Sequence, residues 1–188
     1  LADGVTATGP STVRLWRPHA LLIDALSHIA ASPPPSRLAL DLACGSGRDA
    51  VWLAMESWDV HAWDILPDAL ERCTDLAVRN GVRVSTSCVD LEAEPDISDG
   101  GFDLVCCFNF LHRPLLRMIA NAVRPGGYVV YETFAKSQRE LFGKPASDSH
   151  LLETGELAAA FAGWNTLVNR EEMTGPRRYA SGLIAQRP

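Results

Sequence analysis

The sequence lacks paired cysteines and the ligand spacings of metal sites. Its five cysteines are odd in number, contain no CxxC pair and lie mostly within apolar stretches, at positions 44, 73, 88, 106 and 107. Zinc sites and iron–sulfur clusters need closely spaced ligands, and a disulfide framework needs paired cysteines. The sequence therefore predicts reduced thiols, no metal site and a cytoplasmic location.

Long apolar runs and excess positive charge are also missing. No apolar stretch approaches the roughly 18 residues of a membrane span, and residues 1–10 lack the basic and apolar regions of an export signal. Seventeen Lys and Arg residues face twenty-three Asp and Glu residues, a net charge of -6. Binding to phosphates calls for clustered positive charge, so nucleic acid is a disfavoured partner. We expect no membrane anchor, no export, a small-molecule substrate, and a monomer or homodimer.

The apolar pattern that is present indicates one α/β domain. With 188 residues, 47% of them hydrophobic, the chain suits a single folded unit, which we divide into an arm and helix (1–36), a core (37–134) and a C-terminal part (135–188). Short apolar runs alternate with helical patterns, which predicts a doubly wound, mainly parallel sheet. Helices are expected to begin near residues 18, 49, 67, 114 and 155, and strands at 37–44, 60–64, 82–88, 102–108, 128–134, 164–170 and 178–186, the last two as an antiparallel hairpin.

A glycine turn between a strand and a helix carries most of the functional information. Residues 38–50 read LALDLACGSGRDA, so a strand runs into Gly45 and Gly47 at the start of a helix. Glycines let a ligand approach the backbone, and helix N-terminal N–H groups attract an anion. Gly45, Gly47 and Ala50 match the glycine spacing of a dinucleotide fingerprint. Asp64 lies 17 residues beyond Gly47, near the expected position of the acidic residue that binds the ribose. An NAD-dependent oxidoreductase is therefore one alternative.

Three carboxylates near the ends of successive strands favour a different adenosine cofactor. Asp41 lies four residues before Gly45, where its charge would repel a pyrophosphate and attract a cationic group. S-adenosylmethionine (SAM) combines an amino group, a sulfonium, a ribose diol and an adenine. Asp64 can bind the diol, Asp90 can accept from the adenine amino group, and Leu91 can cover the adenine ring. The pattern therefore predicts SAM as the cofactor.

From residue 38 to the C-terminal hairpin, these motifs resemble those of the class I SAM-dependent methyltransferases. The segment DLACGSG at 41–47 looks like their first motif, and VRPGGYVV at 123–130 like their later turn and strand, although Ala43 stands where a further glycine is customary. The resemblance implies an α/β, Rossmann-like three-layer sandwich with a mainly parallel seven-stranded sheet and an antiparallel C-terminal strand. It also implies that S-adenosylhomocysteine (SAH) is the product. The predicted cofactor-binding residues are Arg14, Asp41, Ala43, Cys44, Gly45, Gly47, Asp64, Ile65, Asp90, Leu91, Phe108 and Asn109.

The segment FNFLHR at 108–113 is expected to frame the methyl group, because open parallel sheets bind ligands beyond the carboxyl ends of their strands. It lacks the prolines of methyltransferases that act on nucleic-acid amino groups. Together with DLACGSGR at 41–48, the segment NFLHRP at 109–114 looks most like the small bacterial tellurite-resistance-type methyltransferases, which implies a small acceptor.

His112 and Arg113 are the candidate catalytic residues. His112 could take the proton of a hydroxyl acceptor, or both could position the negative charge of a thiolate, oxyanion or carboxylate. As an alternative, His112 caps the following helix. The loop at 135–149 is expected to close over the substrate as a lid, or else to be merely flexible, and the charges at 170–172, 177 and 178 are expected to form a solvated face. A non-catalytic, SAM-binding-like scaffold is the second alternative function.

Overall fold

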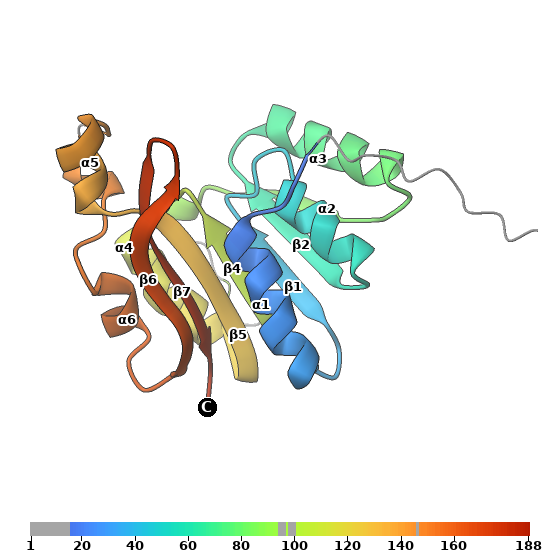
Figure 1. Ribbon diagram of the computed structural model, residues 1–188. Coiled ribbons are helices and arrows are strands. Elements are labelled where there is room, and N and C mark those ends of the chain that lie inside the picture. The colour runs from blue at the N-terminus through green and yellow to red at the C-terminus, as the bar shows by residue number, and fades with distance from the viewer. Residues whose placement is uncertain (1–15, 94–96, 98–100, 146) are drawn as a thin grey trace, which may run out of the picture.

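The fold is a seven-stranded sheet between two layers of helices (Figure 1). A computed structural model describes residues 16–93, 97, 101–145 and 147–188. The strands are β1 (Leu38–Leu42), β2 (Asp59–Asp64), β3 (Ser85–Cys88), β4 (Phe102–Phe108), β5 (Val123–Phe134), β6 (Asn165–Gly175) and β7 (Arg178–Gln186). The helices are α1 (Ala20–Ala31), α2 (Arg48–Met55), α3 (Pro67–Arg79), α4 (Arg113–Ala122), α5 (Lys136–Phe142) and α6 (Glu156–Ala160).

The order of the strands is β3-β2-β1-β4-β5-β7-β6. Adjacent strands from β3 to β5 pair in parallel, and β7 is antiparallel to both of its neighbours. The predicted fold class, including the antiparallel C-terminal strand and the hairpin, is confirmed. Strand β2 pairs with one edge of β1, and β4, which comes later in the chain, pairs with the other edge. Sheets of this kind bind ligands at the carboxyl edge beside such a reversal.

Two apolar clusters fill the space on the two faces of the sheet. One joins α1, α2 and α3 to the sheet, and the other joins α4 and α6 to its opposite face. All seven residues of β4 are buried, as expected of a strand covered on both faces. Its adjacent Cys106 and Cys107 belong to different clusters, which confirms that they point to opposite faces. Within the described residues, no helix is both long and apolar enough to span a membrane.

Proline and glycine place the helix ends that matter for the site. Pro67 and Pro114 lie in the first turns of α3 and α4, where the missing N–H costs no helical hydrogen bond. Gly47 precedes α2 with φ +75°, a left-handed conformation that glycine adopts without strain. These helices therefore begin just beyond the carboxyl ends of β1, β2 and β4.

The structure corrects several predicted segments. The strand expected at 128–134 begins at Val123, and the strand expected at 164–170 extends to Gly175. The strand expected at 82–88 begins only at Ser85, because the N–H of Val82 bonds to the carbonyl of Ala77 and closes the end of α3. The segment 135–149 is not one loop, since it contains α5. Gln138 of α5 is buried, accepts from the N–H of Tyr179 at 2.6 Å and donates to the carbonyl of Arg177 at 3.2 Å. These contacts join α5 to the β6–β7 hairpin, which explains why a polar segment without apolar periodicity forms a helix.

Candidate functional site

The glycine turn and Asp64 are built together at the carboxyl ends of β1 and β2. Ala43, Gly45 and Gly47 all have positive φ, which folds the chain tightly between β1 and α2. One carboxylate oxygen of Asp64 accepts from the N–H of Gly45 at 2.8 Å, and the other from the N–H of Leu66 at 3.0 Å. Each carboxylate oxygen has more than one acceptor position, so Asp64 keeps capacity for a ligand hydroxyl.

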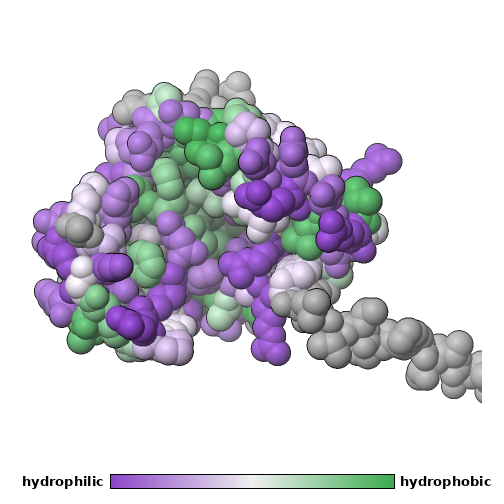
Figure 2. Space-filling view, turned by 90° about the horizontal axis from the view of Figure 1, so that it is seen from above, coloured by the Kyte–Doolittle hydropathy of each residue, from purple (hydrophilic) through white to green (hydrophobic). Residues whose placement is uncertain are grey.

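Two adjoining cavities lie at this edge of the sheet, which Figure 2 shows from above. The first, of about 320 Å³, is lined by Ala43, Asp64, Ile65, Val89, Asp90, Leu91, Glu92 and Phe110. The second, of about 350 Å³, is lined by Asp41, Ala43, Cys44, Gly45, Ser46, Arg48, Asp49, Phe108, Asn109 and Phe110. Ala43 and Phe110 line both, so the two spaces form one extended site of the kind that an elongated cofactor needs.

Nearly all the predicted cofactor residues lie in these walls. Gly47 instead lies buried beneath the turn, where it packs against Cys73 of α3. Arg14 lies outside the described residues. Asp90 is exposed at the first cavity, while Leu91 is buried in its wall. One Asp90 oxygen accepts from the N–H of Glu92 at 2.9 Å, which fixes the carboxylate at the start of a short 3₁₀ turn.

Asp41 contributes a buried carboxyl group to the wall of the second cavity. Its side chain is buried, and its Oδ2 atom has no hydrogen-bond partner. Burial raises the pKa of Asp41 well above its ordinary value, and the nearby charge of Asp49 raises it further. An unpaired buried carboxylate is costly, and a cation beside it would remove that cost. The unpartnered acceptor at this end of the site therefore fits an ammonium group.

The residues on the acceptor side are arranged differently from the prediction. Arg113 holds Glu156 with two contacts, of 2.6 and 2.9 Å, and donates to the carbonyl of Leu151 at 2.9 Å. Its guanidinium joins α4 to α6, so the structure gives no support to a direct role in catalysis. His112 is the residue before α4 but makes no side-chain capping bond, and its Nε2 atom is buried without a partner. Both residues lie outside the walls that the described residues form around the two cavities.

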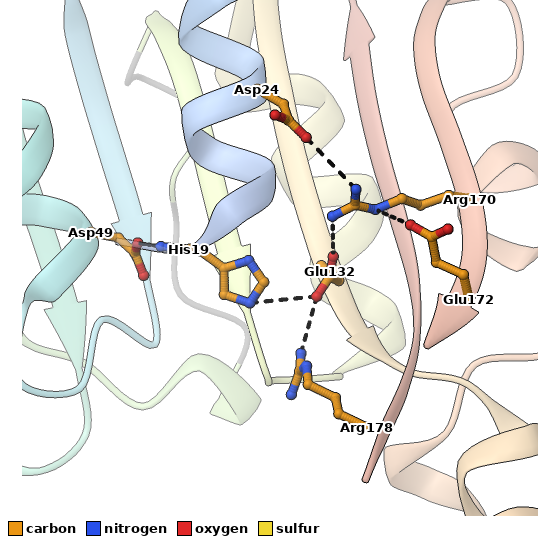
Figure 3. A network of polar contacts seen from close by, with 7 residues as sticks. All are labelled: His19, Asp24, Asp49, Glu132, Arg170, Glu172 and Arg178. Carbon is orange, nitrogen blue, oxygen red and sulfur yellow. Dashed lines mark hydrogen bonds and ion pairs between the residues drawn. The ribbon is translucent and has the colours of Figure 1, made fainter. Parts of the chain in front are cut away.

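A buried ionic network beside the second cavity was missed by the sequence reasoning (Figure 3). Glu132 of β5 is fully buried and binds Arg170 at 3.1 Å and Arg178 at 3.3 Å. Nε2 of His19 lies 3.5 Å from the same carboxylate. The arginines, predicted to be part of a solvated face, are instead partly buried partners of one carboxylate. The sequence does contain one sign of this network, because Glu132 is the one charged residue in the mostly apolar and aromatic segment YVVYETF at 128–134.

His19 connects this network to the cofactor edge. Its ring stacks on Phe108 with centroids 4.2 Å apart and planes 8° from parallel, and its backbone N–H donates to Asp49 at 2.6 Å. Phe108 and Asp49 both line the second cavity. Burial lowers the pKa of His19, against the opposing attraction of Glu132. The start of α1 is thus attached directly to the wall of the site.

Comparison with known proteins fits this geometry. Residues 39–127, which include the glycine turn and the strand ends that form both cavities, match a family described as a methyltransferase domain. Over these residues, just under half of its length, the chain is similar to the class I SAM-dependent methyltransferases. Over 105 residues the chain is 31% identical to the ubiquinone biosynthesis O-methyltransferase of Pectobacterium atrosepticum, covering 53% of this chain and 44% of that enzyme. It spans about half the length of the curated relatives that it matches.

Solved structures share the fold of this chain. A SAM-dependent methyltransferase from Clostridium acetobutylicum superimposes with a TM-score of 0.71 at 12% identity, covering 89% of this chain and 91% of that one. TehB from Haemophilus influenzae gives a TM-score of 0.67 at 18% identity, covering 88% of this chain and 62% of that one. At these identities the likeness concerns the fold, and the roles of individual residues rest on the geometry above.

Replacing Asp64 with alanine should weaken SAM binding about ten- to a hundredfold, because the ribose diol loses a charged acceptor whose hydrogen bonds are each worth roughly 1.5–3 kcal/mol. The substitution also frees the N–H groups of Gly45 and Leu66, which loosens the turn. Asp68→Ala, at an exposed position in the first turn of α3, is the matched control. Calorimetric titration of both folded variants measures the effect, and unchanged affinity in Asp64→Ala would remove this residue from the binding site.

Proposed function

We propose that this chain transfers a methyl group from SAM to a small-molecule acceptor. The observation that carries the proposal is the extended site, with the unpartnered Asp41 carboxylate at one end, Asp64 in the middle and Asp90 at the other end. Asp41 suits a cationic amino group, Asp64 suits a ribose diol, and Asp90 suits an adenine. An NAD pyrophosphate does not suit the end that holds Asp41.

The residues of this chain would bind and orient the two reactants. When bound, SAM supplies a methyl group already activated on a sulfonium. Asp41 and the turn at 43–47 would hold the methionine end, and Phe108 and Phe110 would exclude water from the cavity that they line. Since the methyl group is already activated, alignment of the acceptor provides most of the catalysis, and a strong base is not required for every acceptor.

The acceptor is proposed to be a small molecule with a thiol, oxyanion, hydroxyl or carboxylate group. A relative supports a small acceptor, since the Pectobacterium protein is an O-methyltransferase of ubiquinone biosynthesis. The formal charge of -6 supports the absence of a nucleic-acid substrate. His112 would serve as a base only if substrate binding brings an acceptor hydroxyl to its unpartnered Nε2 atom. The five free cysteines support a cytoplasmic location.

Titration of the chain with three ligands tests the proposal. SAM and SAH should each raise the unfolding temperature in a saturable way, because a ligand that binds only the native state stabilises it. NAD should not. A response to NAD alone would favour the oxidoreductase, and a response to none of the three would favour a scaffold that has lost its cofactor. Transfer of a labelled methyl group to a panel of thiols, phenols, oxyanions and carboxylates would then identify the acceptor.

A further inference from the structure

A further hollow lies between α2 and α3, and it shares no lining residue with the first cavity. These helices pack beside each other (Figure 1). The hollow has a volume of about 360 Å³, and its polar lining comes from Ser46, Arg48, Arg72, Asp75 and Arg79, with Trp16 and Leu76 completing the wall. Three arginines and one aspartate give it an excess of positive charge in a chain whose net charge is -6.

The three arginines share one hollow and, among the described residues, have no carboxylate partner. Elsewhere, Arg113, Arg124, Arg170 and Arg178 all form ion pairs. Within the described part of the chain, Arg48, Arg72 and Arg79 form none, even though Asp75 lies in the same wall. The neighbouring Asp49 carboxylate is bonded to the N–H of His19 instead. These guanidinium groups therefore keep their full hydrogen-bonding capacity.

The positions of the arginines direct their charge into one space. Arg72, Asp75, Leu76 and Arg79 follow the three-and-four spacing of one helical face, and Arg48 faces them from the first residue of α2. A positive side chain at a helix N-terminus is unfavourable, because the end of the helix already carries partial positive charge. An anion in the hollow would relieve this repulsion.

From this geometry we propose that the hollow binds an anionic group, a phosphate or carboxylate of a small molecule. Guanidinium forks match the paired oxygens of both groups, and the Ser46 hydroxyl can donate one more hydrogen bond. Ser46 and Arg48 also line the second cofactor cavity, so a ligand here adjoins the methionine end of the site. The anion is either part of the methyl acceptor or a separate molecule. The inference rests on the proposed function only if the anion is part of the methyl acceptor.

Inorganic phosphate is the probe that tests the site. Titrated without SAM, at an ionic strength held constant with sodium chloride, phosphate should raise the unfolding temperature of the wild-type chain in a saturable way. The double variant Arg72→Gln/Arg79→Gln should bind phosphate at least about tenfold more weakly, since each lost charged contact is worth roughly that factor. Arg117→Gln, at an exposed position of α4, should respond like the wild type.

A wild-type chain that shows no saturable response to phosphate overturns the proposal, and so does a double variant that responds as strongly as the wild type. SAM titration of the double variant shows separately whether it is folded and whether the cofactor site works, so failure of the anion site and failure of the proposed function are distinguishable. In the methyl-transfer assay, inhibition by phosphate that competes with the acceptor assigns the hollow to the acceptor. Phosphate binding without such competition assigns it to a separate anion.

Discussion

Replacing Gly47 with alanine should destabilise the fold by about 2–5 kcal/mol. An added Cβ atom would lie 2.1 Å from Sγ and 2.7 Å from Cβ of Cys73, closer than real side chains approach. The left-handed conformation costs a residue with a Cβ roughly 1–2 kcal/mol, and overpacking typically costs another 1–3 kcal/mol. Cys73 is buried in α3, so relief requires movement between α3 and the glycine turn.

Gly45→Ala is the matched control, because Gly45 has φ +55° but a Cβ atom there would meet open space. It should incur only the conformational cost, about 1–2 kcal/mol. Urea unfolding of the two variants measures the difference. Gly45 lines the second cavity, so a larger side chain there, as in Gly45→Val, should abolish SAM binding while the helices remain. Equal losses of stability in the two alanine variants would contradict the packing argument at Gly47.

Replacing Glu132 with glutamine should cost about 3 kcal/mol of unfolding free energy, near the low end for loss of one partner from a buried ion pair. The substitution keeps the volume but removes the charge that faces Arg170, Arg178 and His19. The side chains of the two arginines are 23% and 24% exposed, so water partly compensates their charge after the change. For this reason the expected loss is at the lower end.

Glu172→Gln supplies the comparison. Glu172 is 3.5 Å from Arg170, but its side chain is 54% exposed. Exposed pairs contribute roughly 0–1 kcal/mol, so this variant should unfold almost like the wild type. Both variants change one glutamate near the same arginine, and chemical denaturation at neutral pH separates them. If Glu132→Gln were as stable as Glu172→Gln, the buried network would not contribute to the fold.

The parts of the fold that follow local patterns could be predicted from the sequence. Pro67 and the Asn80–Gly81 pair define α3, and the wholly apolar run of β4 indicates a strand buried on both faces. In the same way, the glycine turn and the aspartates near the ends of β1, β2 and β3 could be identified from the sequence, and they line the two cavities. Their chemistry is carried by a few residues near one another along the chain.

Features that depend on distant contacts could not be predicted in this way. Helix α5 depends on the contact of Gln138 with residues 177 and 179, about forty positions later. The partners of Glu132 come from α1, β6 and β7, and no local spacing connects them. The bond between Arg113 and Glu156 likewise spans 43 residues. In each case a polar residue looked exposed or catalytic because its partner lay elsewhere in the sequence.

The central position of β1 in the sheet also bears on how the chain is synthesised. On one side β1 pairs with β2, which follows shortly after it, but on its other side it pairs with β4, so that Asp41 lies opposite Cys106. While a ribosome is producing the segment between β2 and β4, one edge of β1 has no strand to pair with. Long-range pairing of this kind slows folding and leaves a strand edge open to aggregation. The cavity wall that includes Phe108 therefore assembles only after all of the chain from β1 to β4 has emerged.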